Sequence, residues 1–461
     1  IRDVERSRGL GDVYKRQLFE GARDEPALIM TSGNLPDEPI ISDNEEALAK
    51  LAGFVDYFVF HERRIAQKCD DSVVKVVDGK PTFIRRSRGY APSPVKLKLK
   101  LRLAALAYGA EENVTACLAF NDKAFLSQYV GEVVKIEGVN YLERTVRHLL
   151  ELTGVKPEAV ACDLHPRFAS THLAKKHGEE FGCSIVQVQH HHAHALSLLA
   201  EHGLEEAVVA VCDGFGYGAD GKAWGGEILY CSLNGWRRLG HLEEQPMIGG
   251  DLATLYPVRM AYGILEKAGV SGAYEWLLEN SRHLPHGEKE AEVVSKMFRQ
   301  GRFLWTTSTG RVLDAVSAIL GVCFRRTYEG EPAMKLEAAA QGGRKVLDVK
   351  PELEGGTLKT SNLISAIFEA AGKFKVRDLA YTAEEYLAEG LAHLAVEKAE
   401  ELGVKAVGFT GGVAFNSHIT STFRRLVEAS KLKFYTNVQV PPGDGGISLG
   451  QAYFAGLMFN R

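Results

Sequence analysis

The stretch AVVAVCDGFGYG, residues 207–218, decides the expected fold. Its first six residues form an unbroken apolar run, Asp213 follows, and three of the last five residues are glycines. This pattern predicts a buried strand that ends in a glycine-rich turn. A similar pattern recurs in KAVGFTGGVAFN, residues 405–416, where the turn leads into an expected helix. Strands that end in glycine-rich turns before helices are typical of α/β nucleotide-binding folds.

The composition indicates a folded protein of more than one domain. A chain of 461 residues exceeds the usual size of one hydrophobic core, so two or three domains are expected. Its 55 basic and 59 acidic residues give a net charge of −4, which argues against a general nucleic-acid binder. Seven scattered cysteines without CxxC spacing predict a reducing compartment. Because no apolar run is long enough to cross a bilayer, we expect a cytoplasmic protein without a membrane partner.

The first 95 residues predict a small α/β unit. Residues 1–17 have no clear periodicity and are left out of the fold prediction. A helix is expected at 44–52, and short strands are expected at 27–32, 55–60, 72–77 and 82–87. The segment APSPVKLKLKLR, with two prolines and alternating lysine and leucine, predicts an exposed connector that leads into a strand. We therefore place a domain boundary near residue 95.

The remaining residues predict a larger α/β unit. Helices follow several of the expected strands and dominate from about residue 252 to 400. Two hairpin-like strands are expected at 115–120 and 124–131, and further strands at 155–163, 184–189, 207–213, 224–233, 405–410 and 433–438.

The densest chemical signal is QHHHAH, residues 189–194, at the start of an expected helix. His190 and His194 are four residues apart, so on a helix they share one face and can chelate one metal ion. A polar helix start or a structural hydrogen-bond network is the simpler alternative. Asp213 and Asp444 are the candidate further ligands, although either could instead cap a helix or close an Asx turn. Such a donor set suits Fe(II) or Zn(II).

Three glycine-rich loops predict a nucleotide cleft. They lie at 214–218, 411–416 and 443–446, each following an expected strand. Glycines there would let backbone N–H groups approach phosphates closely, although each loop alone could be no more than a tight turn. In the front unit, hydroxyl, amide and guanidinium groups at 31–34, 70–72 and 85–88 could hold a triphosphate or simply form a turn and a solvated basic rim.

These motifs together resemble those of one enzyme family. MTSGNLPDEPI, DDSVV and IRRSRGYAP resemble the later part of the YrdC-like domain of HypF carbamoyltransferases. Six further stretches resemble HypF landmarks in the family's order, namely CDLHPRFAST, VQHHHAHALSLLAEHG, DGFGYGADGKAWGGEIL, TTSTGRVLDAVSAILG, YEGEPAMKLE and FTGGVAFN. The similarity covers roughly residues 18–461.

The resemblance implies both a fold and an activity. After a non-family segment at 1–17, it implies a partial YrdC-like α/β domain at 18–95 and an actin-like (ASKHA), two-lobed α/β carbamoyl-transfer domain at 96–461. HypF-like proteins make carbamoyladenylate from carbamoyl phosphate and ATP. They then transfer the carbamoyl group to the C-terminal cysteine of the partner HypE, and the thiocarbamate is the precursor of the cyanide ligands of NiFe-hydrogenase. No nucleophile is therefore expected from this chain, and Cys212 is expected to be a buried core residue.

The resemblance also assigns residues, cofactors and partners. The implied metal ligands are His190, His194, Asp213 and Asp444, and the implied catalytic residues are Asp213 and Arg311. The implied nucleotide-binding residues of the transfer domain are Gly310, Asp314, Glu331, Gly411, Gly412 and Asn416. Those of the YrdC-like part are Ser32, Asn34, Ser72, Arg85 and Arg88. The implied cofactors are ATP or carbamoyladenylate and one divalent Fe or Zn ion, with Mg²⁺ beside the nucleotide as an option. RNA binding by the YrdC-like part is an option but is not expected.

The sequence departs from the family pattern in two places. Whole HypF chains begin with an acylphosphatase domain, CxxC modules and an earlier half of the YrdC-like domain. Because this sequence does not contain them, we expect it to retain mainly the transfer step. The segment GAEEN, residues 109–113, stands where relatives tend to carry a GAELKN-like segment, and it contains no lysine.

Two other enzyme classes use related domains. One is the tRNA threonylcarbamoyl-type enzymes, and the other is O-carbamoyltransferases that act on a small-molecule hydroxyl. The HHHAH motif and the order of the fused domains favour the HypF type over the tRNA enzymes. A chain that only binds partners is the non-enzymatic alternative.

Overall fold

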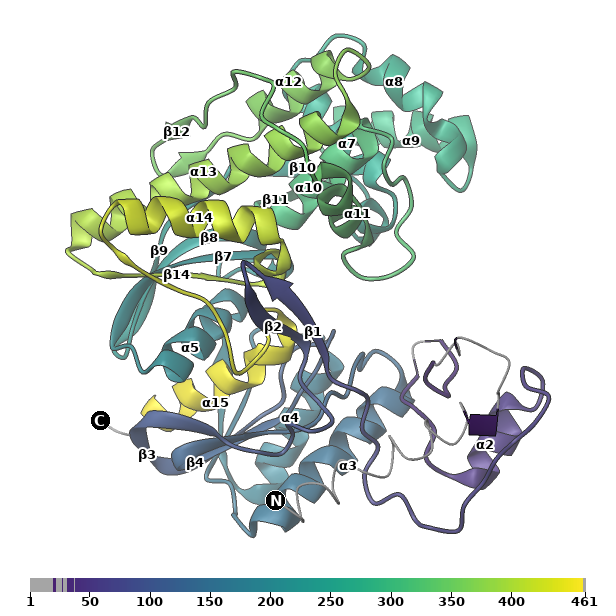
Figure 1. Ribbon diagram of the computed structural model, residues 1–461, viewed down its shortest axis with the longest axis vertical. Coiled ribbons are helices and arrows are strands. Elements are labelled where there is room, and N and C mark those ends of the chain that lie inside the picture. Colours follow the sequence, from purple (N-terminus) through teal and green to yellow (C-terminus); the bar gives the residue numbers. More distant parts are fainter. Residues whose placement is uncertain (1–19, 22–26, 28–30, 37, 459–461) are drawn as a thin grey trace.

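The computed structural model describes residues 20–21, 27, 31–36 and 38–458 (Figure 1). Its front part contains helix α2 (Asn44–Leu51) and an antiparallel hairpin of β1 (Val73–Val77) and β2 (Lys80–Arg85). The helix begins at Asn44 because the Asp43 side chain accepts a hydrogen bond from the backbone N–H of Glu46. The predicted helix at 44–52 and strands at 72–77 and 82–87 are therefore confirmed.

The other two strands predicted for the front part have different outcomes. The strand predicted at 27–32 lies largely on residues outside the described ones. The strand predicted at 55–60 was wrong, because this segment forms no strand. Tyr57 and Val59 are 90% and 94% exposed, so the apolar run has neither a partner strand nor a core to pack against among the described residues.

A four-stranded sheet follows, in the order β4-β3-β5-β6. Its strands are β3 (Val95–Ala107), β4 (Cys117–Leu126), β5 (Ala159–Asp163) and β6 (Ser184–Val188), and helices α3 (Ile136–Thr153) and α4 (Ala169–Phe181) connect them. The alternation of lysine and leucine in β3 matches alternating exposed and buried positions. The hairpin predicted at 115–120 and 124–131 was wrong. Instead, one strand, β4, spans parts of both segments and pairs with β3. Asn121, between the two segments, adopts a left-handed conformation (φ 53°) at a register shift, and the strand continues past it without a hairpin turn.

A second, nine-stranded sheet forms the other part of the fold. Its main path runs β12-β13-β9-β8-β7-β14-β15, and β10 and β11 pair beside β8. The strands are β7 (Glu206–Tyr217), β8 (Ala223–Ser232), β9 (Gly235–Leu242), β10 (Gln245–Met247), β11 (Leu304–Thr306), β12 (Leu353–Glu354), β13 (Thr357–Leu358), β14 (Ala406–Thr410) and β15 (Lys433–Tyr435).

Helices cover this larger sheet and separate it from the smaller one. Helices α5 (His190–His202) and α15 (Ile447–Met458) lie between the two sheets, where α15 packs on β3 and α5 packs on β7 (Figure 1). On the opposite face, the largest hydrophobic core joins β7 and β8 to the helical layer. That layer contains α6 (Asp251–Leu255), α7 (Pro257–Lys267), α8 (Ala273–Glu279), α9 (Gly287–Arg299), α10 (Thr309–Ile319), α11 (Glu331–Ala340), α12 (Ser361–Ala370), α13 (Val376–Leu402) and α14 (Ser417–Ala429). The predicted α/β class and the helical stretch from 252 to 400 are confirmed.

The glycine-rich turn predicted directly after Asp213 was wrong. Strand β7 continues through Gly214 and Gly216 as far as Tyr217, with a register shift against β8. A Cβ atom on Gly216 would lie 2.4 Å from Cε1 of His191 and 2.7 Å from Cδ2 of His190. Glycine is therefore required here so that the strand can pass close to the histidine rings.

None of the described helices combines the length and the apolar composition that crossing a bilayer requires.

Candidate functional site

Helix α5 presents His190 and His194 on one face. The helix begins at His190 because the side chain of Gln189 accepts a hydrogen bond from the N–H of His192 at 2.9 Å. The rings of His190 and His194 are buried and their centroids lie 5.1 Å apart. The predicted helix start and the shared face of the two histidines are therefore confirmed.

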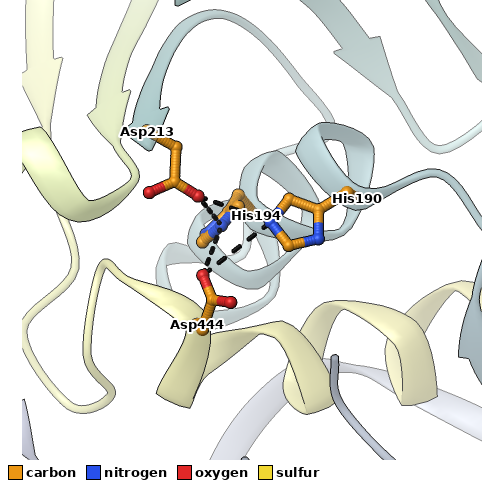
Figure 2. A group of neighbouring side chains, drawn as sticks. All are labelled: His190, His194, Asp213 and Asp444. Atoms are coloured by element: carbon orange, nitrogen blue, oxygen red, sulfur yellow. Dashed lines mark hydrogen bonds and ion pairs between the residues drawn. The ribbon is translucent and has the colours of Figure 1, made fainter. Parts of the chain in front are cut away.

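Two carboxylates approach the same point from other elements (Figure 2). Oδ2 of Asp213, on β7, lies 3.4 Å from Nε2 of His190 and 3.2 Å from Nε2 of His194. Oδ1 of Asp444, just before α15, lies 3.8 and 3.5 Å from the same two nitrogens. One donor atom from each of the four residues lies within 4.8 Å of all the others. The fold thus brings together four residues from distant parts of the sequence.

The charges of this group depend on one another. Burial alone would raise the pKa of Asp213, but hydrogen bonds from His190 and His194 hold it well below its ordinary value. Burial disfavours protonated His190, yet Asp163 and Asp213 raise its pKa well above the ordinary value. Burial and the neighbouring charge of Asp213 raise the pKa of Asp444. Buried carboxylates this close together need a compensating positive charge.

The donor set fits a divalent cation. Two imidazole nitrogens and two carboxylate oxygens form a mixed nitrogen and oxygen set of the kind that binds Zn(II) or Fe(II). Each histidine directs Nε2 toward the carboxylates, so the nitrogens face the same small volume (Figure 2).

One further residue at the site was missed by the sequence prediction. The carboxylate of Asp163, at the end of β5, lies 2.9 Å from Nδ1 of His190 and is fully buried. Asp163 ends the apolar run AVACD and lies in the stretch CDLHPRFAST, but neither signal indicates that it contacts His190. Its nearness to His190 depends on the pairing of β5 with β6, which the sequence does not state.

The loop after β14 contacts Asp213 directly. Gly411 has φ 95°, and a Cβ atom there would lie 2.2 Å from the carbonyl oxygen of Cys212. The N–H of Gly412 donates to Oδ1 of Asp213 at 3.2 Å. Asn416 accepts from the N–H of Ile419 at 2.9 Å and thereby caps α14. The structure therefore places Gly412 against Asp213 and Gly411 against Cys212, whereas Asn416 caps the helix that follows the loop.

The start of α10 lies on the other side of Asp213. The hydroxyl of Ser308 caps the helix and donates to the carbonyl oxygen of Gly214 at 2.7 Å. A Cβ atom on Gly310 would lie only 3.0 Å from Cα of Gly214, so glycine permits this close approach. Nη2 of Arg311 lies 2.9 Å from Oδ2 of Asp314, which is 1% exposed.

The remaining predicted cleft residue, Glu331, makes local contacts. Its carboxylate accepts from the hydroxyl of Thr327 at 2.8 Å and pairs with Lys335 at 2.7 Å. These contacts stabilise the first turn of α11.

The predicted residues of the front part divide into two groups. Ser72 donates to the carbonyl oxygen of Arg88 at 2.9 Å, and Arg85 lies with Ser72 and Arg88 around the hairpin. Asn34 instead closes its own turn by donating to the carbonyl oxygen of Glu38 at 3.1 Å, and Ser32 is exposed.

Arg85 connects the front part to a chain of contacts through Tyr129, Asn113 and Glu329. Its guanidinium lies over the ring of Tyr129, 4.3 Å from the centroid, and the Tyr129 hydroxyl donates to Asn113 at 3.1 Å. Asn113 in turn donates to Glu329. Surrounding protein and the charge of Glu112 raise the pKa of Glu329 to about 8, although part of its side chain is accessible to solvent. Asn113, the last residue of the segment 109–113, therefore takes part in these contacts.

His418, in the first turn of α14, provides a pH-dependent contact beside the loop. It lies between Glu384 (3.0 Å) and Glu385 (2.7 Å). Burial opposes its protonation, but the two carboxylates raise its pKa to about 9 from the ordinary 6.5. The contacts of protonated His418 with Glu384 and Glu385 should therefore contribute fully to the free energy of unfolding below about pH 6.5. This contribution should be lost as the pH rises through about 9.

We expect His418→Gln to lower the free energy of unfolding by about 2 kcal/mol at pH 6.5 and by much less at pH 9.5. Urea unfolding of both proteins at several pH values measures this difference. A difference that does not change with pH would contradict the assignment.

Comparison with known proteins gives consistent similarities. A family model described as "Carbamoyltransferase, Kae1-like Domain, second subdomain" matches residues 209–451. A model described as "HypF Kae1-like domain" matches residues 100–201, and one described as "Telomere recombination", of the Sua5, YciO and YrdC proteins, matches residues 14–87.

Individual relatives agree with these matches. The chain is 43% identical to a probable carbamoyltransferase HypF of Methanocaldococcus jannaschii, over 93% of this chain and 56% of that protein. It is 34% identical to a carbamoyltransferase HypF homolog of Cupriavidus necator, over 76% of this chain and 91% of the relative. A crystal structure of full-length HypF in the phosphate- and nucleotide-bound form superposes with a TM-score of 0.87 at 33% identity, over 94% of this chain and 56% of that one. The chain thus spans about half the length of the full-length relatives that it matches.

Proposed function

Since the chain belongs to the HypF family of carbamoyltransferases, we propose that it transfers a carbamoyl group during the maturation of NiFe-hydrogenase. The donor is carbamoyladenylate, formed from ATP and carbamoyl phosphate, and the acceptor is the C-terminal cysteine of a HypE-type protein in the cytoplasm. One observation carries this proposal: two imidazoles and two carboxylates that could hold a metal ion converge beside a glycine-rich loop, within residues matched by the Kae1-like family models.

We propose that His190, His194, Asp213 and Asp444 hold one divalent Fe or Zn ion. When bound, this ion supplies positive charge that neutralises the phosphate of the donor and polarises the carbamoyl carbonyl. A mixed anhydride is already activated, so the protein has chiefly to position it and to stabilise the developing negative charge.

The nucleotide of the donor is assigned to the loop Gly411–Asn416 and to the start of α10. The N–H of Gly412 lies on the Asp213 side of the loop. Nε of Arg311 is buried without a hydrogen-bond partner among the described residues, and we propose that this guanidinium binds the phosphate side of the donor. The buried Asp314, also a predicted nucleotide-binding residue, then holds Arg311 in place. Mg²⁺ can accompany ATP in the front part.

The transfer step needs a nucleophile from the acceptor. The thiolate attacks the carbamoyl carbon, the bond from that carbon to the adenylate oxygen breaks, and AMP leaves with the electron pair. Cys212, the cysteine nearest the metal ligands in sequence, is fully buried, and burial raises its pKa to about 12. Its predicted position in the core is confirmed, and it is a poor nucleophile.

The front part contributes to the same loop. Nζ of Lys75, on β1, contacts Glu337 at 2.6 Å and donates to the carbonyl oxygen of Phe415 at 2.9 Å. Glu337 also accepts from the N–H of Ser417 at 2.9 Å. Lys75 therefore links the β1–β2 hairpin to the loop that ends at Asn416. We assign the hairpin to a YrdC-like part at residues 18–95 and the loop to the transfer part at 96–461.

The function is tested by incubating a HypE-type protein with this chain and supplied carbamoyladenylate, followed by mass spectrometry. We expect a carbamoyl adduct on the C-terminal cysteine of the acceptor, and no adduct with Arg311→Gln. An acceptor whose C-terminal cysteine is replaced by serine is the control. Absence of the adduct with a fully metal-loaded wild-type chain would overturn the proposed acceptor.

A further inference from the structure

We propose that Asp163 is a positioning residue that fixes the tautomer of His190 so that Nε2 is free to bind the metal ion. The inference rests on the proposed metal site and adds to it a residue that does not touch the metal. Oδ2 of Asp163 lies 2.9 Å from Nδ1 of His190, the ring nitrogen that points away from Asp213 and Asp444.

Strand pairing places Asp163 at this position. Strands β5 and β6 are parallel, and Asp163 pairs with Val188, the last residue of β6. The N–H of Leu164 donates to the carbonyl oxygen of Val188 at 3.0 Å, which extends the pairing to the end of both strands. Because α5 begins two residues after Val188, the end of β5 lies beside the first turn of the helix that carries both histidines.

Both carboxylate oxygens of Asp163 have separate partners. Oδ1 accepts from the backbone N–H of His165 at 2.8 Å, and Oδ2 faces His190. The loop is held by the His165 ring, which stacks on Phe168 with centroids 4.0 Å apart and contacts Tyr217 edge-on at 5.2 Å. The carboxylate is fully buried, so neither oxygen is free to turn toward solvent.

These contacts determine where the proton of His190 resides. With the carboxylate oxygen Oδ2 as the acceptor of this hydrogen bond, Nδ1 of His190 is the donor and carries the proton. In the neutral ring, the lone pair is then on Nε2, which faces Asp213 at 3.4 Å. A carboxylate behind a metal-bound imidazole also makes the coordinating nitrogen more basic.

The arrangement is specific to one of the two histidines. Nδ1 of His194 is buried and has no hydrogen-bond partner among the described residues. Asp163 therefore acts on His190 alone. Of the two proposed histidine ligands, only His190 has a carboxylate hydrogen-bonded to its Nδ1 in the part of the chain that the structure describes.

The test is a comparison of Asp163→Asn with Asp163→Ala in the full chain. If the amide introduced by Asp163→Asn keeps its oxygen on the N–H of His165, its NH₂ group faces His190 and moves the ring proton to Nε2. We expect Asp163→Asn to weaken Zn²⁺ or Co²⁺ binding by about 10- to 100-fold, measured by chelator competition. We also expect a changed visible spectrum of the Co²⁺ form, which a purely structural role of Asp163 would leave unaltered.

Glu290→Gln provides a matched control. Glu290 is also a buried carboxylate with two partners, the N–H of His286 at 3.0 Å and the guanidinium of Arg259. It lies on α9, in the helical layer. We expect its loss to change stability but not metal affinity.

The outcomes separate this inference from the proposed metal site. Wild-type affinity and an unaltered Co²⁺ spectrum in both Asp163 variants, with metal lost in His194→Ala, would overturn the role of Asp163 alone. A wild-type chain that binds no metal, or a His194→Ala variant that keeps it, would overturn the metal site itself. Unfolding curves of the metal-free variants show whether each variant is folded. If Asp163→Asn is not folded, Asp163→Ala tests the positioning role of Asp163.

Discussion

Replacing either His190 or His194 by alanine is expected to reduce bound metal from about one ion per chain to background. Both imidazoles are buried, and each lies within 3.4 Å of Oδ2 of Asp213. Removing one nitrogen donor leaves two buried carboxylates close together with less compensating positive charge. Metal analysis of purified chains measures the loss, and carbamoyl transfer should fall with it.

The control for this prediction is His202→Ala. His202 is the last residue of α5 and contacts the carbonyl oxygen of Thr436 at 2.8 Å, away from the four converging residues. It removes an imidazole from the same helix, so we expect full metal content. Metal retained in either His190→Ala or His194→Ala would contradict the assignment of these ligands.

Gly450→Ala is expected to destabilise the protein by about 3 kcal/mol or more and to weaken metal binding at the same time. A Cβ atom on Gly450 would lie 1.9 Å from the carbonyl oxygen of Ala193 and 2.7 Å from its carbonyl carbon. Both atoms belong to the backbone of α5, so relief requires α5 and α15 to separate. His194 follows Ala193 directly, and Asp444 lies just before α15, so the separation would move ligands apart.

Urea unfolding of metal-free protein and metal titration measure the two effects of Gly450→Ala. Gly53→Ala is the control, because a Cβ atom there meets nothing within 4 Å, and its stability should change by less than about 0.5 kcal/mol. A Gly450→Ala protein with wild-type stability would contradict the close packing of α5 on α15.

The sequence predicts the histidine pair well because its geometry is local. A spacing of four residues determines a shared helical face wherever the helix lies, and Gln189 supplies the cap that starts it. Asp213 and Asp444 were candidate further ligands from the residues alone, and the family resemblance then implied that they join this pair. The structure brings them together because β7, α5 and the segment before α15 meet between the two sheets.

Other features depend on contacts between distant segments and were missed. Asp163 gains its partner only when β5 pairs with β6. The glycines after Asp213 predicted a turn, yet Gly214 and Gly216 lie within strand β7. Gly216 lets this strand pass close to the rings of His190 and His191. The run at 55–60 has the apolar composition of a strand, but composition supplies no partner strand.

Asp213 offers one oxygen to the histidines and the other to the N–H of Gly412. A single carboxylate is therefore shared by the proposed metal and nucleotide sites, and each ligand alters a group that the other uses. The four binding constants of such a pair form a closed thermodynamic cycle. By whatever factor nucleotide changes the affinity for the metal ion, the metal ion must change the affinity for nucleotide by the same factor.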